Sequence, residues 1–276
     1  MSVINTNVSA LYAQNALKTN ARAMSTAMEQ LSTGTRVNSA KDDAAGLAIG
    51  QNMTSQIKGL NQAVRNLNDG INMMQTAEGA MIEQSNMLQR MRELAVQSMN
   101  GTYSDTQRGY LDKEFQALST QIGKVATDTK WNDQTLLDAS VNGSGSFTYQ
   151  AGMSSGQTIV VSIAAMTNTG LNVTALVSIA TVTGATTSLG LISTALETIN
   201  GQRAQIGAAI NRMEYAADNL TNISSNATQS RSTIMDTDYA LATTQLAKTQ
   251  IIQQAATAML AQANQQPQSV MALLKG

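Results

Sequence analysis

The sequence predicts a mainly α-helical fold, in which long antiparallel coiled-coil helices come from both chain ends and a small β-hairpin region lies between them. Apolar residues recur every seven positions over two long stretches, one in each half of the chain. The 276 residues include a single Pro, and aromatic residues make up only 3%. Because Pro interrupts helices and aromatic side chains fill broad cores, this composition favours long helices that pack through narrow aliphatic seams.

Composition also excludes several functions. The chain has 17 Lys and Arg against 18 Asp and Glu, so we expect no nucleic-acid binding. It has no Cys and no His, which removes thiolate, imidazole and most zinc chemistry, and we expect neither an enzyme nor a cofactor or metal site. No apolar run reaches the roughly 18 residues of a membrane span, and the start lacks the pattern of a secretory signal peptide. We therefore expect no membrane insertion.

The first predicted helix follows one seven-residue line and ends at Gly34, a typical helix stop. By itself this pattern also fits any amphipathic surface helix. The line consists of Val3, Ala10, Leu17, Met24 and Leu31.

A stronger seam begins at residue 53 and predicts a long coiled-coil helix. A turn at 100–103 follows, and apolar spacing over 106–127 predicts a returning helix. The seam residues are Met53, Ile57, Leu60, Val64, Leu67, Ile71, Met74, Met81, Leu88 and Ala95.

The middle of the chain, 139–188, is rich in Ser, Thr and Gly. Two β-prone runs, 147–149 and 158–163, flank the glycines at 152 and 156 and predict a β-hairpin. The run 181–183 favours strand or loop, but 164–188 as a whole allows no firm assignment. The Ser and Thr residues fit either an uncharged loop or sites for O-linked glycans.

A second seam predicts another long helix, and an amphipathic tail over 246–263 follows it, which we expect Pro267 to end before an apolar terminus at 270–274. Both chain ends are thus amphipathic and nearly uncharged, so we expect them to need a partner: each other and the same ends of neighbouring subunits. The seam residues are Ile192, Ile199, Ile206, Met213, Leu220, Ala227, Ile234 and Leu241.

The string LSTGTRVNSAKDDAAGLAI at 31–49 resembles the N-terminal signature of bacterial flagellins. Motifs at 219–220, 231, 236–240, 250–255, 258–265, 267–268 and 273–274 resemble the C-terminal one. The resemblance covers 1–138 and 189–276 and implies a short flagellin without large outer domains. It implies an inner coiled-coil domain from 1–44 with 234–276, a helical bundle from 45–138 with 189–233, and a hairpin with a short variable segment at 139–188.

This resemblance implies a structural subunit of the extracellular flagellar filament, an open helical homopolymer that serves motility. It further implies type III export, an export chaperone that holds the C-terminal helix, and contacts with the filament cap and hook–filament junction proteins. The residues it assigns to polymerisation are Leu31, Arg36, Asn38, Lys41, Asp42, Asp43, Arg231, Asp236, Asp238, Ile252 and Leu260. For the charged ones, a solvated loop is the simpler alternative to an ion network between subunits.

A surface helix carries a second resemblance. Gln89, Arg90, Leu94 and Glu114 are similar to the flagellin surface recognised by the flagellin-sensing Toll-like receptor of vertebrates. An ordinary exposed stretch of helix is the alternative.

Two other classes of protein compete with a flagellin. A hook–filament junction protein shares similar terminal helices but diverges in strings that are intact here, at 36–46 and 258–265. An intracellular coiled-coil scaffold fits the heptads alone, but it leaves the flagellin-like signatures at both ends unexplained.

Overall fold

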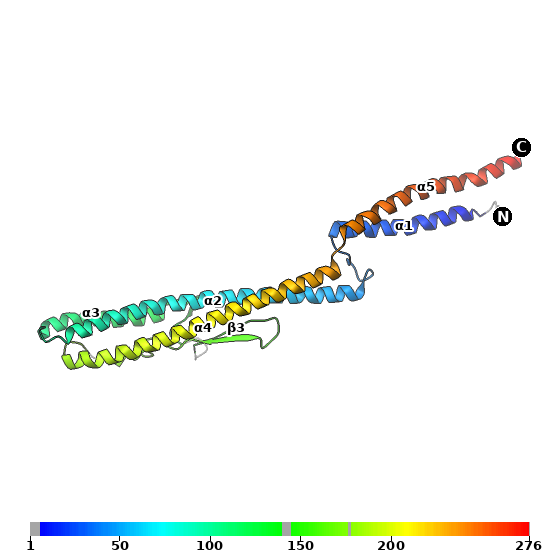
Figure 1. The fold of residues 1–276 in the computed structure, drawn as a ribbon. Helices are drawn as coiled ribbons and strands as arrows, with labels where there is room; N and C mark the ends of the chain where they lie inside the picture. The colour runs from blue at the N-terminus through cyan, green and yellow to red at the C-terminus, as the bar shows by residue number, and fades with distance from the viewer. Residues whose placement is uncertain (1–5, 140–144, 176–177, 276) are drawn as a thin grey trace. The chain divides into compact units, whose positions relative to one another are not determined.

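The computed structural model describes residues 6–139, 145–175 and 178–275, with the side chains of the last helix described as far as Gln265. It confirms the mainly helical fold (Figure 1). The chain forms two compact units, residues 1–57 with 225–276 and residues 58–224. In chain order the elements are α1 (Val8–Thr33), α2 (Ala44–Ser98), α3 (Asp105–Asp128), β1 (Lys130–Trp131), β2 (Gln134–Thr135), β3 (Ser146–Gln150), β4 (Thr158–Ser162), η2 (Val173–Ala175), α4 (Val182–Met235) and α5 (Tyr239–Lys275).

Within the 58–224 unit, α3 and α4 both run antiparallel to α2, and their apolar faces form one core (Figure 1). The two predicted seams are confirmed over this unit, because their main-line residues are buried. Full burial of each Leu, Ile or Met side chain among them contributes about 1.5–3 kcal/mol. The buried seam residues are Leu60, Leu67, Met74, Met81, Leu88 and Ala95 on α2, and Ile192, Ile199, Ile206, Met213 and Leu220 on α4.

Polar side chains fix how these helices meet. The buried Gln84 amide on α2 donates to the carbonyls of Ile122 (3.1 Å) and Met166 (2.9 Å). Arg108 on α3 donates to the carbonyl oxygens of Ser98 (2.8 Å) and Asn100 (3.0 Å), at the end of α2 where carbonyls lack helical partners. The turn predicted at 100–103 is thereby tied to the returning helix.

The predicted β-hairpin is confirmed as antiparallel β3 and β4, with Phe147 opposite Val161. It packs closely on α2, since a Cβ atom at Gly70 would lie 2.8 Å from the Tyr149 ring. A second small hairpin, β1–β2, is absent from the sequence predictions. Its two-residue turn has positive φ at Asn132 and Asp133, as a type I′ turn requires.

The prediction of strand or loop over 181–183 is wrong, because α4 begins at Val182. The Thr181 hydroxyl accepts the Gly184 N–H at 3.2 Å and so acts as a helix cap. Ala185 and Ser188 in the first turns are buried in the core. Capping and burial together outweigh the strand preference of the β-branched residues 181–183.

In the other unit, α1 and α5 run side by side in opposite directions (Figure 1). Gly34, with φ of 71°, ends α1 as predicted, and its N–H donates to the Gln30 carbonyl at 2.9 Å. The first member of the α1 line, Val3, and the side chains of 270–274 lie outside the described residues.

Two predictions about the second half fail in this unit. The seam does not continue to Leu241, because α4 ends at Met235 and Leu241 lies on α5 with 70% of its surface exposed. Pro267 does not end α5, which runs on to Lys275. A Pro has no N–H for the carbonyl four residues earlier, here that of Ala263. The Asn7 side-chain amide donates to that carbonyl instead, at 2.8 Å.

Candidate functional site

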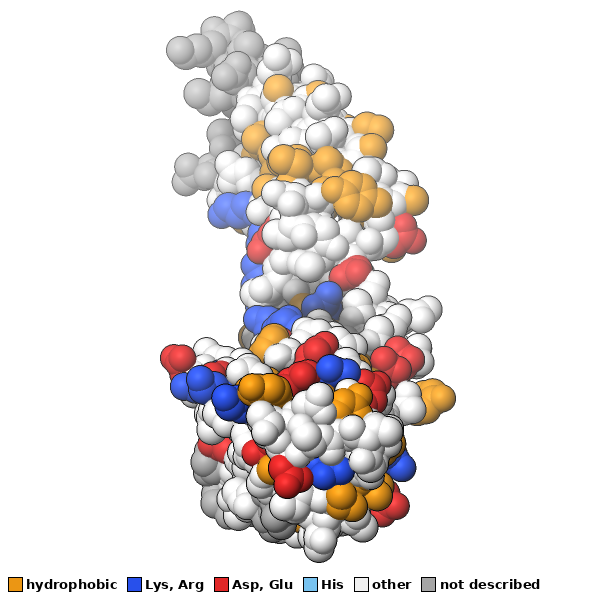
Figure 2. All heavy atoms as spheres, turned by 90° about the vertical axis from the view of Figure 1, so that its left-hand side faces the viewer, with side chains coloured by type: hydrophobic (Ala, Val, Ile, Leu, Met, Phe, Trp, Pro, Cys, Tyr) orange, Lys and Arg blue, Asp and Glu red, His pale blue; other side chains and the backbone are white. Residues whose placement is uncertain are grey.

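The most unusual surface of the molecule is the α1–α5 pair, where large apolar side chains stand exposed. Figure 2 shows hydrophobic side chains gathered on this part of the chain, with few charged ones among them. Large apolar side chains that gather in water on one part of a protein favour an interaction surface. We call the following residues the apolar surface: Val8, Leu11, Tyr12 and Met28 on α1, and Tyr239, Leu241, Ile251, Ile252 and Met259 on α5.

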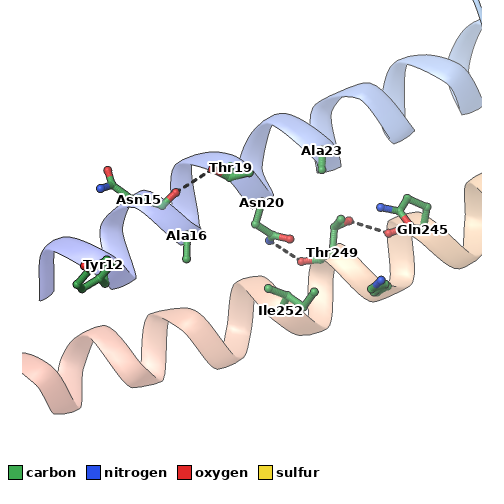
Figure 3. Close-up of a pocket in the computed structure, with 10 residues that line it drawn as sticks. Tyr12, Asn15, Ala16, Thr19, Asn20, Ala23, Gln245, Thr249 and Ile252 are labelled. Carbon is green, nitrogen blue, oxygen red and sulfur yellow. Dashed lines mark hydrogen bonds between the residues drawn. The ribbon is translucent and has the colours of Figure 1, made fainter. Parts of the chain in front are cut away.

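A groove of about 620 Å³ runs between α1 and α5 (Figure 3). Tyr12 and Ile252 line it together with polar side chains such as Thr19 and Gln245. Across it, the Asn20 amide donates to the Thr249 carbonyl at 2.8 Å. Of the predicted polymerisation residues, Ile252 lines this groove with 40% of its surface exposed, whereas Leu260, further along α5, is partly buried.

The segment after α1 is hydrogen-bonded to the α4–α5 connection. Arg36 reaches across with its side chain, which donates to the Ile234 carbonyl at 2.7 Å, and with its backbone N–H, which donates to the Met235 carbonyl at 2.6 Å. In return the Thr237 N–H donates to the Gly34 carbonyl at 3.0 Å. The sequence-distant strings that carry Arg36 and Asp236 therefore meet as a short antiparallel bridge.

The four predicted carboxylates each make bonds within their own chain. Asp43 accepts the Gly46 N–H at 2.8 Å at the start of α2, and Asp238 accepts the Ala240 N–H at 2.9 Å at the start of α5. Asp236 accepts from the Ser232 hydroxyl at 2.6 Å. Asp42 accepts from the hydroxyl and N–H of Ser39, and the hydroxyl bond above all lowers the pKa of this carboxyl.

The remaining predicted polymerisation residues flank this bridge. The Asn38 amide donates to the Thr33 hydroxyl at 2.9 Å and so shapes the loop, while Lys41 is exposed on it. Leu31 and Arg231 are partly exposed. Among the described residues, no three His, Cys, Asp or Glu side chains gather as a metal site. In that same part of the chain, no helix is long and apolar enough to cross a membrane.

The second predicted surface lies on α2 and α3. Arg90 bridges the two helices, since its guanidinium lies 2.9 Å from carboxylate oxygens of both Glu93 and Glu114. The Glu114 hydrogen bond, followed by that of Glu93, raises the pKa of Arg90. Gln89 is exposed beside them. Leu94 differs from the other three, because it is fully buried in the core and has no surface for a partner to touch.

Comparison with known proteins matches both ends of the chain to one family. The model of the bacterial flagellin N-terminal helical region matches residues 4–142, and that of the C-terminal helical region matches 189–274. The chain belongs to the bacterial flagellin family. It is similar to a flagellin of Halalkalibacterium halodurans, with 42% identity across 99% of this chain and 100% of that protein. It is also similar to flagellin B of Vibrio cholerae, with 34% identity across 98% of this chain and 99% of that protein.

A solved flagellin structure agrees with this assignment. The crystal structure of Bacillus cereus flagellin matches with a TM-score of 0.51 and 31% identity, over 56% of this chain and 88% of that one. A putative flagellar hook-associated protein from Vibrio parahaemolyticus shares the fold, with a TM-score of 0.60 but only 15% identity, over 70% of this chain and 99% of that one. As a flagellin, this chain is a structural subunit of the extracellular flagellar filament and not an enzyme.

Sequence reasoning missed three side chains that join α1 to α5: Asn7, Asn20 and Tyr239. The Tyr239 hydroxyl donates to the Leu31 carbonyl at 2.8 Å. Asn20 could have been found from its place in the apolar pattern, because a polar residue on a coiled-coil seam usually has a partner. Asn7 gives no such signal, since its acceptor is 256 residues away in sequence.

Proposed function

We propose that copies of this flagellin join through the apolar surface of the α1–α5 pair. The observation that carries this proposal is the exposure of large side chains there, with Ile251 at 66% and Leu241 at 70%. Contacts that bury this surface between copies remove it from water at about 25 cal/mol per Å². Contacts of one surface with a different surface of the next copy generate an open helical filament when the rotation between copies does not close a ring.

In this proposal the predicted polymerisation residues have two roles. Leu31, Ile252 and Leu260 contact neighbouring subunits by apolar burial, and the charged Lys41 and Arg231 contact them from the rim. The others, Arg36, Asn38, Asp42, Asp43, Asp236 and Asp238, act through the bridge and helix caps that set how the chain enters α2 and α5. Substituting this second group changes the presentation of the apolar surface rather than its composition.

The variant Ile251→Gln tests the role of the apolar surface, because it replaces an exposed apolar side chain with a polar one on the same helix. We expect a soluble protein whose seeded assembly, measured by sedimentation and electron microscopy, is reduced at least tenfold. The control is Gln254→Ala, an exposed position one turn further along α5 that leaves the apolar surface intact. Normal filaments from Ile251→Gln would contradict the proposal.

The same apolar surface on α5 is the segment that we propose an export chaperone covers before assembly, and that filament cap and hook–filament junction proteins contact afterwards. Nearly uncharged amphipathic helices fit grooves of partner proteins through their apolar face. Binding of the export chaperone to full-length chain should be weakened by Ile251→Gln and unchanged by Gln254→Ala. Equal binding of both variants would exclude this face as the chaperone site.

We further propose that the exposed α2–α3 surface of Gln89, Arg90 and Glu114 is recognised by the flagellin-sensing Toll-like receptor of vertebrates. The cross-helix ion pair supports this, since it holds Arg90 in one orientation on a rigid face. Arg90→Ala should reduce receptor-reporter activation at least tenfold, whereas Arg65→Ala, exposed on the same helix, should not. Leu94 acts only by supporting the helix from the core.

A further inference from the structure

Asn7 makes two hydrogen bonds that tie one end of α1 to a distant part of α5. Its side-chain oxygen accepts the Ala10 N–H at 3.0 Å and so caps α1. Its side-chain nitrogen donates to the Ala263 carbonyl at 2.8 Å. Because the two bonds use different atoms of one carboxamide, Asn7 serves both helices at once.

The acceptor on α5 is a special one. In an α-helix the carbonyl of residue 263 would accept the N–H of residue 267, but residue 267 is Pro and has none. The carbonyl therefore needs a donor from outside its helix. By contrast, the Thr249 carbonyl, to which Asn20 of α1 donates, can also accept the N–H of Gln253 within α5.

We propose that Asn7 and Pro267 together form a register lock between α1 and α5, with Asn7 as a positioning residue for the apolar surface. If α5 slid by one helical turn, about 5.4 Å, the Ala263 carbonyl would lose its donor and Asn7 would face a carbonyl that already has one. Asn7, which supplies the donor that Pro267 lacks, also caps α1. A correct register is the only arrangement that satisfies both helices.

Asn20 and Tyr239 support the same register from within the pair. Asn20 is buried on α1 and donates to the Thr249 carbonyl and to the Gln253 side chain. Tyr239, at the start of α5, donates to the Leu31 carbonyl near the end of α1. Buried polar residues in coiled coils select one register over others of similar apolar burial. This inference rests on the proposed function where it concerns assembly. A shifted register would displace the α5 residues of the apolar surface relative to its α1 residues.

The test compares five full-length chains: the natural sequence, Asn7→Asp, Pro267→Ala, the double variant of these two, and Asn7→Ser. Asp caps helices as well as Asn does, so Asn7→Asp keeps the cap on α1 but removes the donor to Ala263. Pro267→Ala restores an N–H inside α5, which makes the Asn7 donor dispensable. Asn7→Ser serves as an uncharged control that lacks the amide donor.

Hydrogen-exchange mass spectrometry measures how well the backbone amides of residues 255–265 are protected from exchange. We would measure this protection in monomers and in sedimented filaments. We expect Asn7→Asp and Asn7→Ser to lower protection about tenfold, equivalent to 1.4 kcal/mol. The double variant should differ from Pro267→Ala by less than threefold. An equal loss from Asn7→Asp in both backgrounds would overturn the lock, because Asn7 would then act independently of the Ala263 carbonyl.

Sedimentation of the same samples separates this inference from the proposed assembly surface. If no chain forms filaments, the assembly proposal fails, while protection in the monomers still decides the lock. If the natural chain forms filaments but residues 255–265 are unprotected in both states, the lock is wrong and the assembly proposal stands.

Discussion

The 58–224 unit and the α1–α5 pair share a heptad pattern of apolar residues, but they differ in how much of it they bury. In the 58–224 unit the seam residues of α2 and α4 are enclosed in one core together with α3 and the β3–β4 hairpin. On α1 only Ala10, Asn20 and Ala27 are buried, and on the described part of α5 only Ala242 and Thr249. Two helices can cover only one face of each other, so the pair leaves apolar side chains in water.

This difference indicates where each unit obtains its stability. We expect the 58–224 unit to be stable within one chain, because its core side chains are buried there. Isolated helices gain little from propensity, and their stability comes mostly from packing of an amphipathic face. On the proposal above, burial between subunits completes the α1–α5 pair.

The sharpest way to break this comparison is a matched pair of Leu→Ala substitutions. Leu88→Ala removes a fully buried side chain from the 58–224 core and should lower the free energy of unfolding by about 2–5 kcal/mol. Leu241→Ala removes a side chain that is 70% exposed and should change the free energy of unfolding by less than about 0.5 kcal/mol. The same substitution should nevertheless impair assembly. Urea unfolding followed by circular dichroism, with sedimentation of seeded samples, measures both effects. Similar unfolding losses from the two variants would contradict the division.

A substitution at Asn20 should separate stability from specificity within the α1–α5 pair. Asn20→Leu exchanges a buried amide for an apolar side chain and should stabilise the pair by about 1–2 kcal/mol. It should also reduce filament yield, because the amide bond to the Thr249 carbonyl no longer favours one register. Thermal melts of the monomer and sedimentation of seeded samples test this opposition. A variant that is more stable and assembles normally would show that Asn20 does not set the register.

The smallest expected effect concerns alkaline pH and the 58–224 unit. Burial raises the pKa of Tyr149 well above its usual 10.0. The unfolded chain therefore loses this proton first as pH rises, so the stability from the neutral buried phenol is complete below pH 10 and declines above it. At pH 11, Tyr149→Phe should recover about 1 kcal/mol of unfolding free energy relative to the natural chain. Tyr215→Phe, at a 77% exposed tyrosine, is the control and should recover none.

Most of the helices could be predicted from the sequence, because the spacing of apolar residues within one helix is a local pattern. The seams at Leu60–Ala95 and Ile192–Leu220, the Gly34 stop and the β3–β4 hairpin all follow from local pattern. The start of α4 was missed because Val182 and Thr183 favour strands, although the Thr181 cap was a readable signal.

What could not be predicted depends on residues far apart in the chain. Pro267 was expected to end α5, but the helix continues, and the donor that replaces the missing N–H, the Asn7 amide, comes from the other end of the sequence. Leu94 fits its surface motif by position, yet the helix rotates it fully into the core. For the carboxylates Asp43 and Asp238 the sequence left open a solvated loop or an ion network between subunits, and it did not predict that they accept from the first N–H groups of α2 and α5.

The central claim is that the α1–α5 pair joins subunits while the rest of the chain folds alone. It is tested most directly by seeded sedimentation and negative-stain electron microscopy of the full-length chain beside a chain of residues 44–235, which retains α2 to α4 and lacks α1 and α5. We predict filaments from the full-length chain only, with the trimmed chain remaining in the supernatant and helical by circular dichroism. Filaments from the trimmed chain would contradict the account.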